Sequence, residues 1–311
     1  MKVVLVINKT LISHITDLYM NNKDATLVTN NGIDYRYASI YDKDDDDTTS
    51  GGLMNDRQGS MDIGEDAGNI SYYGADPNNY IYFNCDDYNN PSDTTCELWR
   101  IIGIVDGKVK IARDSVLSST MAWNTAGNNN WSTASLNTYL NGDYYESLRT
   151  KNPDTLDLIS MSTWYLGGYS TTSGLYANDI YGYERKNEVG TTIYSGNPPS
   201  IEANIGLMYA SDYGYATDLS VCDKDIYNYD TSANCKDKDW LFKSNGTNTN
   251  QWLITPHSSD SSYAWHLDSL GYVNGGYGVA GAFGVRAVLY LNSELVIETG
   301  DGSKDTPYVV R

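Results

Sequence analysis

Short apolar runs separated by longer polar stretches recur along this 311-residue chain. Runs rich in β-branched and aromatic side chains predict buried strands. They occur at residues 80–83, 98–105, 108–112, 252–254 and 288–291, and again near the end at 295–297 and 307–310. Asp106 and Gly107 separate two of these runs, and Asp-Gly in that position is a strong hairpin signal. The pattern therefore predicts antiparallel sheets.

Helical spacing of apolar residues is less frequent than strand-like patterning. Residues 9–19 place apolar side chains at intervals of three and four, which predicts a short amphipathic helix. A second helix is expected over residues 131–148, with Ser132 as its cap, and another over 154–161. Residues 42–68 and about 169–199 are rich in Gly, Ser, Tyr or Asp without periodicity, so they are expected to be loops.

Composition and charge exclude several classes of partner. With 40% hydrophobic residues the chain can form a genuine core, and its net charge of −19 repels nucleic acids and anionic membranes. No apolar run reaches the roughly 18 residues that span a bilayer, and residues 2–7 are too short for the apolar region of a signal peptide. We therefore expect no nucleic-acid partner, no membrane-spanning segment and no export signal in this chain.

The four cysteines fall into two close pairs, Cys85 with Cys96 and Cys222 with Cys235. Both spacings are too long for CxxC metal or redox motifs, so two local disulfides are the simplest interpretation. Each would stabilise the fold by about 3 kcal/mol in the chain-entropy model and would persist only in an oxidising compartment. The alternative is four reduced, buried cysteines in a cytosolic or phage-borne protein.

The segment from Ser258 to Phe283, here called the recognition segment, lies between the apolar runs at 252–254 and 288–291. It consists mainly of Ser, Gly, Ala, Tyr, Asp and Asn. Antibody combining sites have the same composition, in which rigid Tyr rings are set among small adaptable residues. The segment is therefore predicted to be a displayed recognition surface, and an ordinary surface loop is the alternative.

Three motifs carry a family resemblance. They are Leu-Trp-Arg-Ile-Ile-Gly-x-x-Asp-Gly-x-Val-Lys from Leu98, Trp-Leu-Ile-x-Pro-x-Ser-Ser from Trp252, and Gly-Val-Arg-x-Val-Leu-Tyr-Leu from Gly284. In this order they resemble C-type-lectin-fold domains related to the formylglycine-generating enzyme. Within that superfamily the chain most resembles the variable proteins of diversity-generating retroelements.

The resemblance implies an α+β fold. We expect a C-type-lectin-like domain over residues 80–311, with twisted antiparallel sheets, one or two helices and long loops. Residues 1–79 would form an N-terminal extension made of a short helix and an acidic loop. In that loop Asp42 and Asp44–Asp47 could be imagined to bind calcium, but the EF-hand spacing is absent, and a solvated charge run is the favoured interpretation.

Retroelement mutagenesis rewrites template adenines, and this leaves a testable pattern in the protein. Randomising the adenines of the Asn codon AAC cannot yield Lys, Glu, Gln or Met. These four residue types supply 30 of the 311 residues, so a window of 26 would hold two or three, yet the recognition segment contains none. Trp265 cannot arise from this codon either, so we assign it to the scaffold.

If residues 252–254 and 285–291 are core strands, the segment between them is held at both ends and presented outwards, so its side chains are expected to bind the ligand. The predicted ligand-binding residues are Ser258, Asp260, Tyr263, His266, Asp268, Tyr272, Asn274, Tyr277 and Phe283. The last seven are expected to form a contiguous face in which Tyr and Phe are the anchors.

Catalysis finds little support in the sequence. The formylglycine-generating branch binds copper through cysteines placed late in the chain, and no cysteine follows Cys235. His257 and Asp260 near Ser258 resemble a triad fragment, but no nucleophile elbow surrounds them. We expect no cofactor, no metal and no enzymatic activity.

The predicted function is a non-catalytic recognition or adhesion protein on a cell surface or phage particle. Its ligand would be a protein or glycan on another cell or surface. The alternatives are an enzyme of the formylglycine-generating-like or glycoside-processing type, and a structural coat protein.

Overall fold

The computed structural model describes residues 9–39, 50–59, 62–63, 66–171, 173–243 and 249–311. Its central feature is a ten-stranded sheet in which all neighbouring strands are antiparallel. Eight strands follow one another in the spatial order β1 (Lys23–Asn30), β2 (Ile33–Ala38), β3 (Ser50–Asn55), β6 (Ile70–Asp76), β8 (Glu97–Val105), β9 (Lys108–Arg113), β19 (Val288–Leu291) and β11 (Ile159–Ser160). Off this path, β7 (Tyr80–Phe83) pairs with β8, and β14 (Ile205–Gly206) pairs with β19.

The hairpin predicted at Asp106 and Gly107 is confirmed by β8 and β9. Val105 pairs with Lys108, which leaves a two-residue turn. Both turn residues have positive φ, 52° for Asp106 and 79° for Gly107. Two consecutive positive φ values characterise the type I′ turn that Asp-Gly favours, because its twist matches that of the strands. The runs at 252–254 and 288–291 are likewise strands, and both are fully buried.

The first 79 residues contribute more than a helix and an acidic loop. The predicted helix is present as α1 (Leu11–Asn22), where the Thr10 side chain accepts a hydrogen bond from the Ser13 amide. However, β1, β2, β3 and β6 belong to the main sheet, and β6 pairs directly with β8. The expectation of a loop over 42–68 is therefore wrong for β3, β4 (Asp62–Ile63) and β5 (Asp66–Ala67). The acidic run at Asp42–Asp47 lies outside the described residues.

Helical segments are more numerous than the one or two expected. The described residues contain α2 (Ser135–Tyr139), which continues through a π-helical turn (Leu140–Tyr144) into α3 (Tyr145–Lys151), and further α4 (Ala177–Arg185), α5 (Ala210–Ala216), α6 (Ala233–Lys236) and α7 (Trp240–Lys243).

Three details of the predicted helices and loops are corrected. Asn130, rather than Ser132, caps the turn before α2, because its side-chain oxygen accepts from the Ser132 amide. The helix expected over 154–161 is a 3₁₀ segment (Pro153–Leu158) followed by β11. The loop expected over about 169–199 contains α4, whose residues Ile180, Tyr181 and Glu184 are buried.

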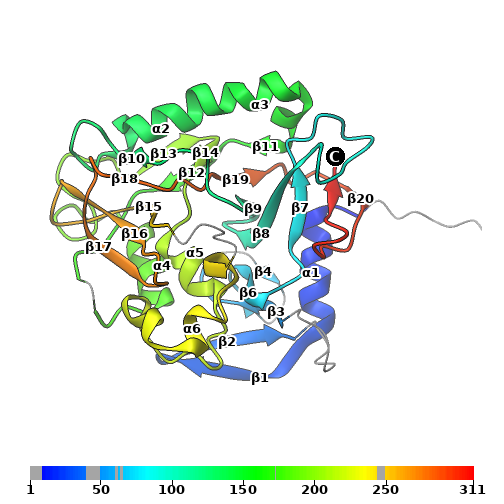
Figure 1. Cartoon of the computed structure of the whole chain (residues 1–311). Helices are drawn as coiled ribbons and strands as arrows, with labels where there is room; N and C mark the ends of the chain where they lie inside the picture. The colour runs from blue at the N-terminus through cyan, green and yellow to red at the C-terminus, as the bar shows by residue number, and fades with distance from the viewer. Residues whose placement is uncertain (1–8, 40–49, 60–61, 64–65, 172, 244–248) are drawn as a thin grey trace, which may run out of the picture.

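Small sheets surround the main one. They are β15 (Gln251–Pro256) with β16 (Tyr263–Leu267) and β17 (Val273–Gly278), β12 (Ser162–Tyr165) with β13 (Ser200–Ala203), β10 (Met121–Ala122) with β18 (Ala282–Phe283), β20 (Ile297–Thr299) with β21 (Val309–Val310), and β4 with β5. Figure 1 shows α2 and α3 along one edge of the molecule, the β15–β17 sheet at the side away from the C-terminus, and β1 and β2 at the opposite edge from α3. The described structure is thus α+β with mostly antiparallel sheets.

Both predicted disulfides are confirmed. Cys85 bonds to Cys96 and Cys222 bonds to Cys235, and no free cysteine remains. The first closes the loop after β7. The second closes the loop that carries a 3₁₀ segment (Ile226–Thr231) and α6.

Candidate functional site

A three-stranded antiparallel sheet carries the recognition segment. It consists of β15 (Gln251–Pro256), β16 (Tyr263–Leu267) and β17 (Val273–Gly278), and every residue of β15 is buried. The segment is therefore not uniformly displayed, as the sequence analysis expected. All four residues 264–267 of β16 are buried, so this strand is covered on both faces. On β17 the buried Val273 and Gly275 alternate with the half-exposed Asn274, as expected for a strand covered on one face.

Trp265 anchors this sheet to the rest of the fold. Its ring stacks on Tyr169 with 3.9 Å between ring centroids, and its indole nitrogen donates to the Tyr169 carbonyl at 3.1 Å. A Cβ atom on Gly275 would lie 2.6 Å from the Trp265 ring, so only glycine fits beside it. The side chain is 1% exposed, which agrees with its assignment to the scaffold.

Asn129, which the sequence analysis did not single out, holds the loop between β15 and β16. The side-chain nitrogen of Asn129 (Nδ2) lies within hydrogen-bonding distance of three backbone carbonyls and donates to them, those of His257 (2.8 Å), Asp260 (3.0 Å) and Tyr263 (2.9 Å). Its own side-chain oxygen accepts from the Asn197 amide group at 2.9 Å. Asn129 is 1% exposed, so this single side chain fixes the loop from inside. Three consecutive asparagines at 128–130 are the only trace of this role in the sequence.

We expect Asn129→Ala to lower the free energy of unfolding by about 2 kcal/mol, because buried carbonyls would lose their donor. Hydrogen exchange of residues 257–263 should accelerate at the same time. Urea unfolding and exchange mass spectrometry measure the two effects. Asn90→Ala, at an exposed position, is the control and should change stability by less than about 0.5 kcal/mol. Unchanged exchange in the 257–263 loop would contradict the role of Asn129.

The turn between β16 and β17 is held just as firmly. The Asp268 amide donates to the Tyr272 carbonyl at 2.8 Å, and Asp268 Oδ1 accepts from the Leu270 amide at 2.9 Å. From below, the buried Tyr213 hydroxyl donates to the Gly271 carbonyl at 2.8 Å. These contacts leave the Leu270 side chain outside, where it is 60% exposed. A rigid turn thus presents one large apolar side chain to solvent.

An aromatic cluster lies in the middle of the sheet. Phe283 lies 4.6 Å from Trp252, 4.8 Å from His266 and 4.4 Å from Tyr277, measured between ring centroids. Tyr277 is 45% exposed, whereas His266 and Phe283 are buried beneath it. Burial lowers the pKa of His266 to about 4, although Asp268, 4.0 Å from its Nε2, acts in the opposite direction. His266 is therefore neutral at pH 7.

Three of the nine predicted binding residues are corrected by their burial. Ser258, His266 and Phe283 are 3%, 3% and 8% exposed, so none is displayed. Ser258 is buried because its amide pairs with the Tyr169 carbonyl. His266 and Phe283 are buried because they pack with Trp252, whose indole donates to the Met121 carbonyl.

Of the six remaining residues, Tyr277 is exposed and the other five are half-buried, and the structure groups them. Asp268, Tyr272 and Asn274 lie together. Burial raises the pKa of Tyr272, the charge of Asp268 adds to the rise, and a hydrogen bond with the Asn274 side chain opposes it. Asp260 and Tyr263 lie at the other end of β16, and Tyr277 lies between the two groups.

Two exposed or half-exposed side chains beside this surface were missed by the sequence analysis. One is Leu270, and the other is Tyr227, whose ring meets Tyr272 edge to face at 5.6 Å. Tyr227 comes from the loop closed by Cys222 and Cys235, far from the recognition segment in sequence. No local signal could place it here.

The suspected triad fragment is not assembled. His257 Nδ1 faces the Ser259 amide at 3.4 Å, and the buried Ser258 hydroxyl has no hydrogen-bond partner within the described residues. No group of three or more His, Cys, Asp or Glu side chains within the described ranges is arranged to hold a metal ion.

A buried carboxyl group braces β15 from behind. Glu184 on α4 accepts hydrogen bonds from the Ser211 hydroxyl on α5 and from the Thr255 hydroxyl on β15 (2.8 Å). Burial raises the pKa of Glu184 to about 7. Beside it, Lys110 Nζ and Asp212 Oδ2 form a buried ion pair at 2.6 Å. These contacts join two helices to the strand that supports the recognition segment.

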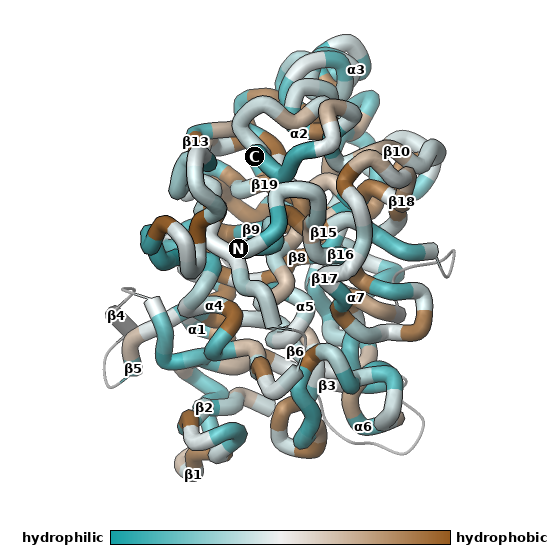
Figure 2. The backbone as a smooth tube through the Cα atoms, turned by 90° about the vertical axis from the view of Figure 1, so that its left-hand side faces the viewer, coloured by the Kyte–Doolittle hydropathy of each residue, from teal (hydrophilic) through white to brown (hydrophobic). Residues whose placement is uncertain are grey.

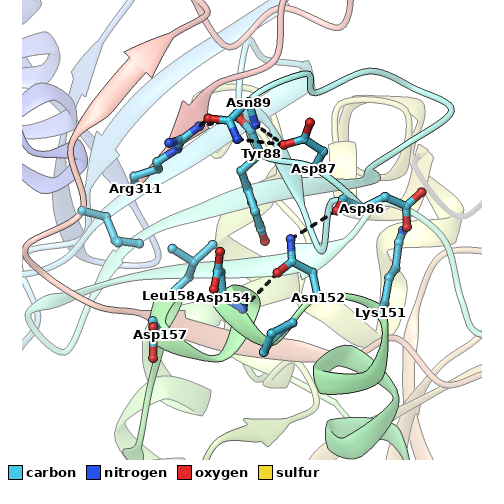
Figure 3. A pocket seen from close by; sticks show the side chains of 12 residues that line it. Asp86, Asp87, Tyr88, Asn89, Lys151, Asn152, Asp154, Asp157, Leu158 and Arg311 are labelled. Atoms are coloured by element: carbon cyan, nitrogen blue, oxygen red, sulfur yellow. Dashed lines mark hydrogen bonds and ion pairs between the residues drawn. The ribbon is translucent and has the colours of Figure 1, made fainter.

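A cavity of about 570 Å³ lies elsewhere, between the Cys85–Cys96 loop and the 3₁₀ segment after α3. Figure 3 shows Asn152 hydrogen-bonded to the Asp86 carbonyl, with Arg311 and Lys151 on opposite sides. Leu158 and Leu295 are buried in its wall, and four aspartates line it. None of the nine predicted binding residues lines this cavity, so the cavity is separate from the recognition segment.

Comparison of the chain with protein-family models, with curated proteins and with solved structures found no match. Among the helices of the described residues, none is both long and apolar enough to cross a membrane.

Proposed function

We propose that this protein is a non-catalytic ligand-binding protein that recognises a protein or glycan on another cell or surface. The fold would be C-type-lectin-like, and retroelement mutagenesis would diversify the recognition segment. One observation carries the proposal. The segment presents the exposed Tyr277 and the half-exposed Tyr272 and Asn274 on and next to β17, while the four residues 264–267 of β16 are buried in the core. Such a rigid frame lets exposed side chains vary while the fold is preserved.

An extracellular location, on a cell surface or a phage particle, fits the same proposal. Two disulfides require an oxidising compartment to persist. The net charge of −19 disfavours nucleic acids and anionic membranes as partners. A wet surface rich in Tyr, Asn and Asp suits a polar macromolecular ligand.

Diversification is tested at the locus that encodes the chain. We expect an adjacent reverse transcriptase and a near-identical template repeat that matches residues 258–283. Related copies should differ at the exposed positions, such as Tyr272 and Tyr277, and should keep Trp265 and Gly275. A locus without a template repeat, or copies that differ evenly along the chain, would overturn this part of the proposal.

Binding is tested with the labelled full chain on arrays of defined glycans and of surface proteins. For a ligand found this way, Tyr277→Ala or Tyr272→Ala should weaken affinity by about 2 kcal/mol or more, because exposed aromatic anchors dominate such interfaces. Tyr145→Ala on α3, which lies away from β16 and β17 in Figure 1, is the matched control. If affinity survives replacement of Tyr263, Tyr272 and Tyr277 together, then the ligand binds elsewhere on the protein.

A further inference from the structure

Lys110 and Asp212 meet inside the protein, although they lie far apart in the sequence. Lys110 is on β9 in the main sheet, and Asp212 is on α5. Figure 2 shows β9, α4 and α5 in the middle of the molecule, between β1 at one end and α3 at the other. The Nζ atom of Lys110 lies 2.6 Å from Oδ2 of Asp212, and the two side chains are 0% and 5% exposed. The contact is therefore almost completely shielded from solvent.

The ammonium form of Lys110 is poorly satisfied in this place. An ammonium group carries three N–H donors, yet Asp212 is the single hydrogen-bond acceptor of Nζ within the described residues. The other neighbours are aromatic, since Nζ lies 4.3 Å from the ring centroid of Tyr209, 5.3 Å from that of Tyr290 and 5.5 Å from that of Trp164. Burial lowers the pKa of Lys110, and the charge of Asp212 opposes this shift. Burial thus favours the neutral amine, which is the nucleophilic form.

The carboxyl group of Asp212 is held in position for attack by this amine. Its Oδ2 atom also accepts a hydrogen bond from the Tyr209 amide at 2.7 Å, which fixes the orientation of the group. The carboxyl carbon is one bond beyond Oδ2, so Nζ lies close to the roughly 3–3.5 Å from which two atoms react. The Tyr209 amide also stabilises the negative charge that this oxygen gains when the nitrogen attacks.

Short distance alone does not distinguish this pair from an ordinary ion pair. Lys9 Nζ and Asp17 Oδ2 lie 2.5 Å apart, but their side chains are 34% and 55% exposed. Water solvates the charges of that pair, whereas taking both charges of the buried pair out of water is costly. Lys9 and Asp17 therefore serve as an internal control for Lys110 and Asp212.

We propose that Lys110 and Asp212 are joined by a covalent amide bond between Nζ and Cγ. One proton of the ammonium group passes to the carboxylate. The nitrogen lone pair then forms the N–C bond, one C–O bond breaks, and the hydroxyl group leaves with a second nitrogen proton as water. The amide nitrogen keeps the third hydrogen, and the remaining oxygen still accepts from the Tyr209 amide. The bond replaces a buried ion pair by a neutral group and is independent of ligand binding by the recognition segment.

Mass spectrometry of the full chain, after reduction of the disulfides, tests the proposal. We expect the wild type to be lighter than its sequence by the mass of one water molecule. Trypsin cannot cleave after a linked Lys110, so the digest should contain residues 109–113 joined to residues 187–224. Residues 3–9 and 10–23 should appear as separate peptides, because the exposed Lys9 and Asp17 do not react.

Asp212→Ala should restore the full sequence mass. Asp143→Ala, at an exposed position in the π-helical turn, is the control and should keep the loss of one water molecule. In a denaturing, reducing gel the wild type should migrate faster than Asp212→Ala, because the bond closes a loop between residues that are 102 positions apart.

The mass of the wild type decides the proposal even where Asp212→Ala fails to fold. A wild type at its full sequence mass would overturn it. A missing water that maps to a succinimide at Asp106 and Gly107, with normal cleavage after Lys110, would overturn it as well.

Discussion

Trp265→Ala is expected to lower the free energy of unfolding by about 3–5 kcal/mol, the range for removing a buried large aromatic side chain. The indole is 1% exposed, stacks on Tyr169 and donates to its carbonyl. Its loss would leave a cavity between β16, β17 and the chain at Tyr169, and collapse is limited because Gly275 has no side chain to fill the space. Urea unfolding followed by circular dichroism measures the change.

Tyr277→Ala is the matched comparison for Trp265→Ala. The Tyr277 ring lies on the same sheet but is 45% exposed. Its removal should cost about 1 kcal/mol, since it loses ring contacts with Phe283 and little burial. Equal costs for the two substitutions would contradict the division of the segment into a buried scaffold and an exposed surface.

The fold could be predicted only in part from the sequence. The hairpin at Asp106 and Gly107 and both disulfides follow from local signals, because turn chemistry and short cysteine spacings act over a few residues. The buried runs of β15 and β19 were found for the same reason, since three or four consecutive large apolar residues between polar stretches are best placed in the core.

Features that depend on distant partners were not predicted. β3 reads Ser-Gly-Gly-Leu-Met-Asn, a pattern without alternation, and it is a strand because β2 and β6 pair with it on both sides. By contrast, α4 carried a usable signal, because Ile180, Tyr181 and Glu184 are spaced as on one helical face. Its Tyr and Gly residues masked that periodicity.

The candidate site shows the same limit. Composition located the recognition segment but could not separate Tyr277, which is exposed, from His266 and Phe283, which are buried. The difference is made by Trp252 and by the pairing of β18 with β10, a contact with residues 121–122. Asn129 and Tyr227 likewise belong to the site through contacts with residues that are distant in sequence.

His266 gives the last prediction, which concerns pH. Its pKa in the fold is about 4, against an ordinary value of 6.5, because the ring is buried among Trp252, Tyr277 and Phe283. The folded state therefore disfavours the protonated ring, whereas the unfolded chain accepts the proton. The contribution of neutral His266 to stability is fully present above pH 6.5 and is lost as the pH falls from 6.5 towards 4. Asp268 is the nearest acid, and its charge opposes the effect without reversing it.

Other groups titrate in the same range, so the contribution of His266 must be isolated by difference. Burial raises the pKa values of Asp56 and Glu184 to about 7, and their contributions grow as the pH falls below 7, with the opposite sign. Those groups titrate equally in wild type and in His266→Gln. Between pH 7.0 and pH 4.5 the wild type should lose about 2 kcal/mol of unfolding free energy relative to His266→Gln. Urea unfolding of both proteins at the two pH values measures this, and parallel pH profiles would show that the buried ring does not resist protonation.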